Sequence, residues 1–205
     1  MLSMVTDVKI PEGERWPRSV GGHVALDLVN TDVVAQDDRS DDVLRSAAEF
    51  LVWCADNGVP AQRDGQDVDA PGLTAEAARL RTAVREIVEA IAGGTAPSPD
   101  ALSALQSAYA EAVARSAPVL HDGRLRWELG PATPAAPVAH LAVAAVELLR
   151  EGPTDRIKVC PSCGFLFIDA TKNRSRRWCS MDDCGKQEKM RRYVAKRART
   201  RLADD

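Results

Sequence analysis

The sequence is poor in aromatic residues and histidine, and it lacks the short motifs that mark many enzymes. Aromatic residues make up 4% of its 205 positions, and histidine occurs three times. The chain has no Ser-His-Asp order, no Gly-x-Ser-x-Gly elbow, no metallo-hydrolase motif and no nucleotide-binding fingerprint. These absences argue against catalysis, and we expect a protein that is not an enzyme.

Long hydrophobic runs are missing as well. The most apolar stretch, residues 138–149, is interrupted by His140 and Glu147, whereas a membrane-spanning helix needs about 18 apolar residues in a row. The N-terminus has no basic segment followed by an apolar run, which a secretory signal would have. We therefore expect a cytoplasmic protein with no membrane partner.

Cysteine is scarce but concentrated. Four of the five cysteines follow the spacing C-x2-C-x15-C-x4-C, which is typical of a tetrahedral zinc site: Cys160, Cys163, Cys179 and Cys184. Four thiolates fill the coordination shell and leave no place for a reactive water, so the pattern predicts one structural Zn²⁺. Disulfides and unligated core cysteines are the alternatives; the missing secretory signal argues against the first and the spacing against the second. The fifth cysteine, Cys54, is expected to be a small buried hydrophobic residue.

Metal and fold should depend on each other in this segment. About fifty residues bury too little apolar surface to fold securely alone, so zinc binding and folding should form one equilibrium. Between the first two ligands, Pro161 fixes one dihedral of a tight turn, and Gly164 is suited to a positive φ.

The charge is divided unevenly along the chain. Residues 156–205 contain 14 Lys and Arg against 6 Asp and Glu, a net charge of +8, while residues 1–155 contain 13 against 24, a net charge of −11. Such asymmetry indicates a nucleic-acid-binding end joined to a domain with another role. We place the domain boundary after Pro153, giving domains 1–153 and 154–205.

The residues after Cys184 predict a basic helix. Met190, Tyr193, Val194 and Ala198 form a narrow apolar stripe that we expect to pack on the zinc core. Basic residues on another face of this helix, with a second cluster upstream, predict contacts to double-stranded DNA by Lys172, Arg174, Arg176, Arg177, Lys186, Lys189, Arg192, Lys196 and Arg199. The alternatives are neutralisation of the zinc–thiolate charge, a solvated face, or a protein partner.

Residues 1–153 are expected to be mainly α-helical with a small β-hairpin, an α+β domain. Apolar periodicity predicts helices over about residues 43–57, 74–92, 100–116 and 138–150, with Asp41 or Asp42 capping the first and Asp100 capping the third. Asp122-Gly123 between alternating apolar residues predicts the hairpin, and a strand should cover residues 157–160. The C-terminal domain is expected to be a treble-clef-like zinc finger of short hairpins and a basic helix.

The cysteine segment resembles a known family. The runs Cys160-Pro-Ser-Cys-Gly164, Phe167-Ile-Asp169, Asn173-Arg-Ser-Arg-Arg-Trp-Cys-Ser-Met181 and Cys184-Gly185 are similar to the CGNR zinc finger of bacterial transcriptional regulators. This chain has Lys186-Gln187 where the family has Asn-Arg. The zinc ligands are untouched by that departure, but Lys186 restores a charge without the bidentate fork of an arginine.

The N-terminal segment Gly21-Gly-His-Val-Ala-Leu-Asp-Leu-Val-Asn-Thr31 resembles the opening of the ABATE domain, which usually precedes a CGNR finger. That resemblance implies a domain that senses a ligand, with His23, Asp27 and Asn30 as ligand-binding residues and Arg85 where the family places an arginine. The alternatives are helix capping and backbone hydrogen bonds for the first three residues, and an ion pair with Glu89 for Arg85.

Together these features predict a DNA-binding transcriptional regulator with a zinc finger and a sensor domain for a small-molecule effector. A zinc-stabilised module for protein interaction or RNA binding is the alternative. Because a short finger offers few base contacts, sequence-specific binding should need a homodimer or a second binding surface.

Overall fold

The structure is a computed structural model that describes residues 19–32, 42–61, 72–129 and 136–203. Its elements, in chain order, are α1 (Val24–Val29), the 3₁₀ turn η1 (Val43–Arg45), α2 (Ala47–Asp56), α3 (Leu73–Gly93), α4 (Pro99–Ala114), β1 (Ser116–His121), β2 (Arg124–Leu129), α5 (Ala136–Glu151), the 3₁₀ turn η2 (Thr154–Arg156), β3 (Ile157–Val159), β4 (Leu166–Ile168), the π-helical turn η3 (Met181–Gly185) and α6 (Lys186–Ala203).

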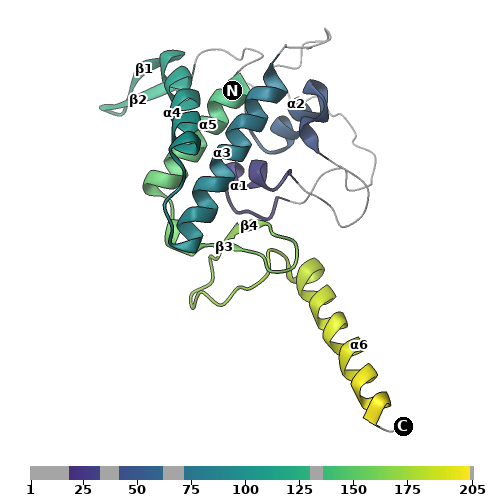
Figure 1. Cartoon of the computed structure of the whole chain (residues 1–205). Coiled ribbons are helices and arrows are strands. Elements are labelled where there is room, and N and C mark those ends of the chain that lie inside the picture. Colours follow the sequence, from purple (N-terminus) through teal and green to yellow (C-terminus); the bar gives the residue numbers. More distant parts are fainter. Residues whose placement is uncertain (1–18, 33–41, 62–71, 130–135, 204–205) are drawn as a thin grey trace.

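These elements form three parts (Figure 1). The helical body consists of α1–α5 with η1 and the β1–β2 hairpin. The zinc module, residues 157–185, lies at one end of the body, and α6 projects from it into solvent. The predicted fold class, mainly α with a small hairpin followed by a zinc finger, is confirmed.

The helical body is held by a single apolar core. α3 contributes one stripe of it, Leu80, Val84, Ile87 and Val88, and packs against α4 and α5. α5 is buried along much of its length, as its almost uniformly apolar sequence predicts. Cys54 lies in the same core and is fully buried, as expected.

Two predicted helix starts are corrected by the structure. The predicted helix over residues 43–57 is interrupted at Ser46, which has extended backbone angles and caps α2 by accepting a hydrogen bond from Glu49 N. Asp42 caps the preceding 3₁₀ turn, through Leu44 N. α4 is capped by Ser98 rather than Asp100, because Pro99 suits the first helical position and Ser98 Oγ accepts from Ala101 N.

The predicted hairpin is present. β1 and β2 pair antiparallel around Asp122 and Gly123, both with positive φ, at 48° and 75°. That conformation matches the twist of a two-residue turn, which explains the Asp-Gly signal. Leu120 pairs with Leu125, and Pro118 with Trp127, so these apolar side chains share one face.

The apolar stripe of α6 is a failed prediction. Met190, Tyr193 and Val194 are exposed by 62%, 55% and 58% and do not pack on the zinc core. The core around the cysteines is instead closed by Phe167, with Phe165, Trp178 and Val20 beside it. In the part of the chain that the structure describes, no helix has both the length and the hydropathy to cross a membrane.

Candidate metal centre and nucleic-acid interface

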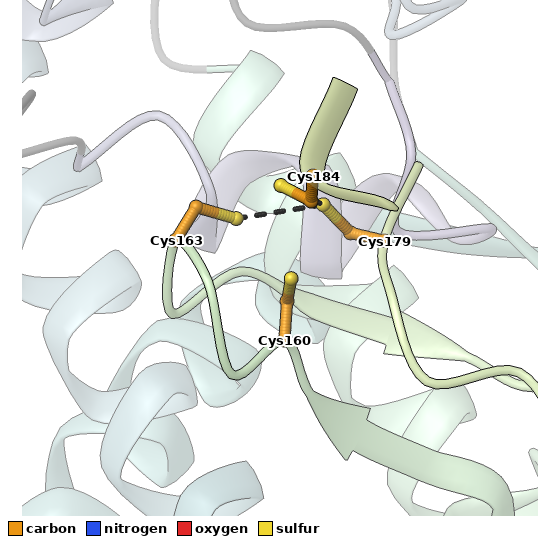
Figure 2. A group of neighbouring side chains, drawn as sticks. All are labelled: Cys160, Cys163, Cys179 and Cys184. Atoms are coloured by element: carbon orange, nitrogen blue, oxygen red, sulfur yellow. Dashed lines mark hydrogen bonds between the residues drawn. The ribbon is translucent and has the colours of Figure 1, made fainter. Parts of the chain in front are cut away.

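The four clustered cysteines converge on one point although they come from two separate segments. Their sulfur atoms all lie within 4.8 Å of one another, and the side chains point inward (Figure 2). Cys163 Sγ lies 3.4 Å from Cys179 Sγ, which lies 3.6 Å from Cys184 Sγ. A tetrahedron with zinc–sulfur bonds of about 2.3 Å has edges of about 3.8 Å, so the sulfurs are arranged to bind one zinc ion.

The first ligand pair is held by a tight turn. Gly164 N donates to Cys160 O, and Cys160 N donates to Phe165 O, both over 2.8 Å. Gly164 has φ of 77°, as predicted, so the chain can reverse there without steric cost. The turn points the sulfurs of Cys160 and Cys163 to the same side (Figure 2).

The second pair depends on a different local structure. Cys179 lies in an irregular segment directly before Ser180, and Cys184 lies in the π-helical turn η3. Ser180 begins that turn by accepting a hydrogen bond from Asp183 N and donating one to Asp183 Oδ2. This capped turn brings Cys184 back beside Cys179, and both are buried.

The closely spaced thiols shift one another's pKa values in opposite directions. Hydrogen bonding with Cys179 lowers the pKa of Cys163 to about 5. The same hydrogen bond, with burial and the negative charge on Cys163, raises the pKa of Cys179 well above its ordinary value. Four sulfurs this close repel one another as thiolates, and a bound divalent cation would offset that repulsion.

A buried carboxylate organises the loop between the ligand pairs, and sequence reasoning missed its role. Asp169 accepts hydrogen bonds from Lys158 Nζ (2.6 Å), Thr171 N (2.9 Å) and Arg176 N (3.0 Å). Burial would raise the pKa of Asp169, but these charged and backbone donors outweigh it and hold the pKa well below its usual value. The signal in the sequence was the aspartate itself, because an Asp side chain in a turn commonly accepts a hydrogen bond from the backbone two residues on, here Thr171 N.

The structure divides the predicted DNA-contacting residues into inward and outward groups. Arg176 is partly buried: its guanidinium lies 4.6 Å from the Phe167 ring and donates to the carbonyls of Trp178 and Cys179. Arg174 is exposed and forms an ion pair with Asp155 on the surface. Arg176 therefore has an internal role in the zinc module.

The remaining basic residues are exposed where their side chains are described: Lys172, Arg177, Lys186, Lys189 and Arg192. Lys186 forms an ion pair with Asp182 of η3, and Arg192 forms one with Glu188 of α6. The side chains of Lys196 and Arg199 lie outside the described residues.

The predicted ligand-binding residues lie at the junction of α1, α3 and β4, and their polar groups bind protein atoms. His23 Nδ1 caps α1 through Ala25 N, and burial lowers its pKa. Asp27 accepts from Gly21 N, and burial raises its pKa. Asn30 pairs with the backbone of Leu166.

Arg85 interacts with two partners, and Arg81, one helical turn earlier, is more buried. Arg85 donates to Val29 O over 2.7 Å and forms the anticipated ion pair with Glu89. Arg81 is 7% exposed and makes a two-pronged ion pair with Asp42, at 2.6 and 3.0 Å. Sequence periodicity alone gave no reason to prefer Arg81 over Arg85.

A cavity of about 280 Å³ lies elsewhere in the helical body, between α3, α4 and α5. Its walls include small apolar residues, among them Ala104, Ala108 and Ala112. Glu76, Arg79, Glu111 and Arg115 provide charged groups around it. None of the four predicted ligand-binding residues lines this cavity.

Two family models match the chain and together cover most of it. The ABATE family, described as "putative stress-induced transcription regulator", matches residues 22–152. The CGNR zinc finger matches residues 156–197, which include all four clustered cysteines. No curated protein matches the chain. Since the first model spans more than half of the sequence, the chain belongs to the ABATE family, and it carries a CGNR zinc finger with one structural zinc site formed by Cys160, Cys163, Cys179 and Cys184.

Proposed function

We propose that the protein is a DNA-binding transcriptional regulator in which the zinc module holds α6 against duplex DNA. The observation that carries this proposal is that α6 is strongly basic and exposed to solvent. It contains eight Lys and Arg against one Glu, and its described side chains are exposed except that of Glu188, which is partly buried.

The size of α6 supports the same proposal. Eighteen residues form a helix of about 27 Å, and a B-DNA major groove about 12 Å wide admits one helix. A helix with this charge gains little by packing on the protein, whereas phosphates provide counter-charges along both walls of the groove. Exposed Met190, Tyr193 and Val194 would add apolar contacts with base edges or sugars.

Salt dependence of duplex binding tests the proposal. A protein that neutralises about six phosphates has a log–log salt slope near −5. Changing Lys189, Arg192 and Lys196 together to Ala should weaken binding to all duplexes and make the slope shallower by about 3 units. A matched control removes three exposed charges from the helical body that lie outside the cavity, Arg45, Arg124 and Arg150, and should leave the slope unchanged.

The same titration separates the alternative functions. An RNA-binding module would prefer double-stranded or single-stranded RNA over duplex DNA of the same length. A protein-interaction module would bind neither with a steep salt slope. If the intact protein has no duplex affinity at low salt, the DNA proposal is wrong.

For the helical body we propose effector sensing. The cavity between α3, α4 and α5 supports this role better than His23, Asp27 and Asn30, each of which makes hydrogen bonds to the protein backbone. Its two arginines and two glutamates suit a small molecule with both acidic and basic groups. A thermal-shift screen of amino acids and related zwitterions tests this: a hit should be lost in Ala108→Leu, which fills the cavity, and kept in Asn30→Gln.

We also propose a homodimer formed through the hairpin face. Leu120, Leu125 and Trp127 are exposed by 70%, 61% and 59% on a two-stranded sheet. This hairpin lies at the opposite end of the body from the zinc module (Figure 1), so such a dimer would leave both α6 helices free. Light scattering should give a dimer for the wild type and a monomer for Leu125→Lys. The cytoplasmic location and the domain boundary after residue 153 stay predictions.

A further inference from the structure

Strand β4 belongs to two cores at once. Leu166 is fully buried in the apolar core of the helical body, together with Ile157 of β3. Phe167, the next residue, is fully buried among the cysteines. Because side chains alternate across a strand, one face of this short strand packs in the core of the helical body and the other face packs against the cysteines.

Asn30 binds β4 as a neighbouring strand would. Its Nδ2 donates to Leu166 O and its Oδ1 accepts from Leu166 N, both over 2.8 Å and both buried. Asn30 is 1% exposed, so these groups have no ready access to water. The amide thereby satisfies both backbone groups of a residue 136 positions away, which would otherwise be buried without a partner.

A second set of hydrogen bonds, here called the second tether, holds β4 beside the Asn30 pair. Ile168 N donates to Gly21 O over 2.9 Å, and Gly21 N donates to Asp27 Oδ1 over 2.8 Å. A Cβ atom on Gly21 would lie 2.8 Å from Leu26 Cβ, so a glycine is required where this segment passes α1. Asp27 therefore fixes Gly21, which in turn binds β4.

From these contacts we infer that Gly21, Asp27 and Asn30 form a docking site for the chain's own β4 strand, and that this site couples zinc binding to the stability of the helical body. Asn30 and Asp27 are positioning residues: they hold the strand that presents Phe167 to the cysteines. Coupling of this kind is reciprocal, so zinc stabilises the body by the same factor by which the docked body strengthens zinc binding. The inference depends on the zinc site and is independent of the proposals for DNA and effector binding.

The full-length protein provides the first test. Amide hydrogen exchange should show slower exchange at Leu166 and Ile168 when zinc is bound, and also slower exchange across α1. Removing zinc with a chelator should lower the melting temperature of the helical body. If α1 exchange and body melting are the same with and without zinc, the inference is overturned.

The second test is a chelator competition for zinc with Asn30→Leu, which removes both hydrogen bonds at similar volume. We expect zinc affinity to fall by about 10-fold, within the range of about 5- to 150-fold that is typical of coupled sites. Asn57→Leu is the control, because Asn57 is a partly buried asparagine whose amide donates to a backbone carbonyl, Trp53 O, within the body and away from β4. The control should keep wild-type zinc affinity.

Gly21→Ala provides an independent variant if Asn30→Leu fails to fold. It should weaken zinc binding in the same direction through the second tether. Unchanged zinc affinity in a folded Asn30→Leu or Gly21→Ala protein, judged by helical circular dichroism, would contradict the inference. Since the competition contains no DNA, its result does not depend on whether the protein binds a duplex.

Discussion

The helical body and the zinc module are stabilised in different ways. The body buries large apolar side chains, such as Trp53, Phe50 and Leu80, in one continuous core. The zinc module buries Phe167 among the cysteines and relies on the metal site, the Asp169 network and its contacts with the body. A segment this small lacks the apolar area to fold on its own. We therefore expect the zinc module to unfold mainly when the metal site is disrupted, and the helical body mainly when its apolar core is disrupted.

The largest effect should come from a metal ligand. Cys163→Ser should abolish zinc binding and unfold residues 157–185, because structural zinc contributes an apparent free energy on the order of 10 kcal/mol. Elemental analysis and amide exchange would measure the loss. Cys54→Ala is the control: this cysteine is buried in the body, and the variant should keep one zinc per chain.

A native-like amide spectrum in Cys163→Ser would show that the zinc module folds without its metal. The helical body and the zinc module would then both be stable without a metal.

The next largest effects should come from substitutions on the two faces of β4, and they should affect different regions. Leu166→Ala should destabilise the helical body by about 2–5 kcal/mol, because it opens a cavity in the apolar core. Phe167→Ala should cost about 3–5 kcal/mol, together with the cation–π contact to Arg176, but mainly in the zinc module. Urea unfolding followed by helical circular dichroism, which reports mainly on the helical body, together with zinc competition, distinguishes the two variants.

Equal zinc affinity in both variants would mean that β4 does not separate the two cores. Such a result would show that the zinc module and the body unfold as one unit.

A smaller effect is expected at the ion pair that fastens α3 to η1. Burial would raise the pKa of Asp42, but the hydrogen bonds and charge of Arg81 lower it below its ordinary value. A carboxyl with a lowered folded-state pKa adds stability above its unfolded pKa, and that stability is lost as pH falls through the folded value. Asp42→Asn should therefore destabilise the body at pH 7, by about 2 kcal/mol.

Urea unfolding between pH 7 and pH 2 measures the change. The acid-dependent loss of stability should be smaller in Asp42→Asn than in the wild type. Glu49→Gln is the control, because Glu49 pairs with exposed Arg45 on the helix surface. An equally steep pH dependence in Asp42→Asn would assign the acid sensitivity to other carboxyls.

The smallest effect on stability is expected on α6. Arg192 is exposed and paired with Glu188 on the same helix, and exposed ion pairs contribute little. Arg192→Ala should leave the melting temperature unchanged while weakening duplex binding. If Arg192→Ala lowers the melting temperature as much as Asp42→Asn, α6 packs on the protein more than its exposure indicates.

Much of the fold could be predicted from local signals. The cysteine spacing identified the zinc site, because tight turns around a tetrahedral ion restrict ligand spacing. Asp122-Gly123 identified the hairpin, because two positive φ angles are needed there. The long helices followed from apolar periodicity, with errors at their ends where Ser46 and Ser98 cap the chain.

The candidate sites were less predictable, because they depend on which residues meet in space. Arg176 was grouped with the exposed basic residues, although it binds carbonyls and the Phe167 ring inside the zinc module. The stripe on α6 had the spacing of a packed helix face, yet no surface within the described residues lies opposite Met190, Tyr193 and Val194. Periodicity describes one helix and carries no information about whether a partner surface exists.

The sequence by itself determined the metal ligands, the helical class and the concentration of positive charge at one end, because these follow from residue type and spacing. Only the tertiary structure decided the roles of Asn30 and Asp27, since a buried amide or carboxylate takes its role from the partner that folding brings to it. Here that partner is strand β4, more than 130 positions away from Asn30, and no local pattern records such a pairing.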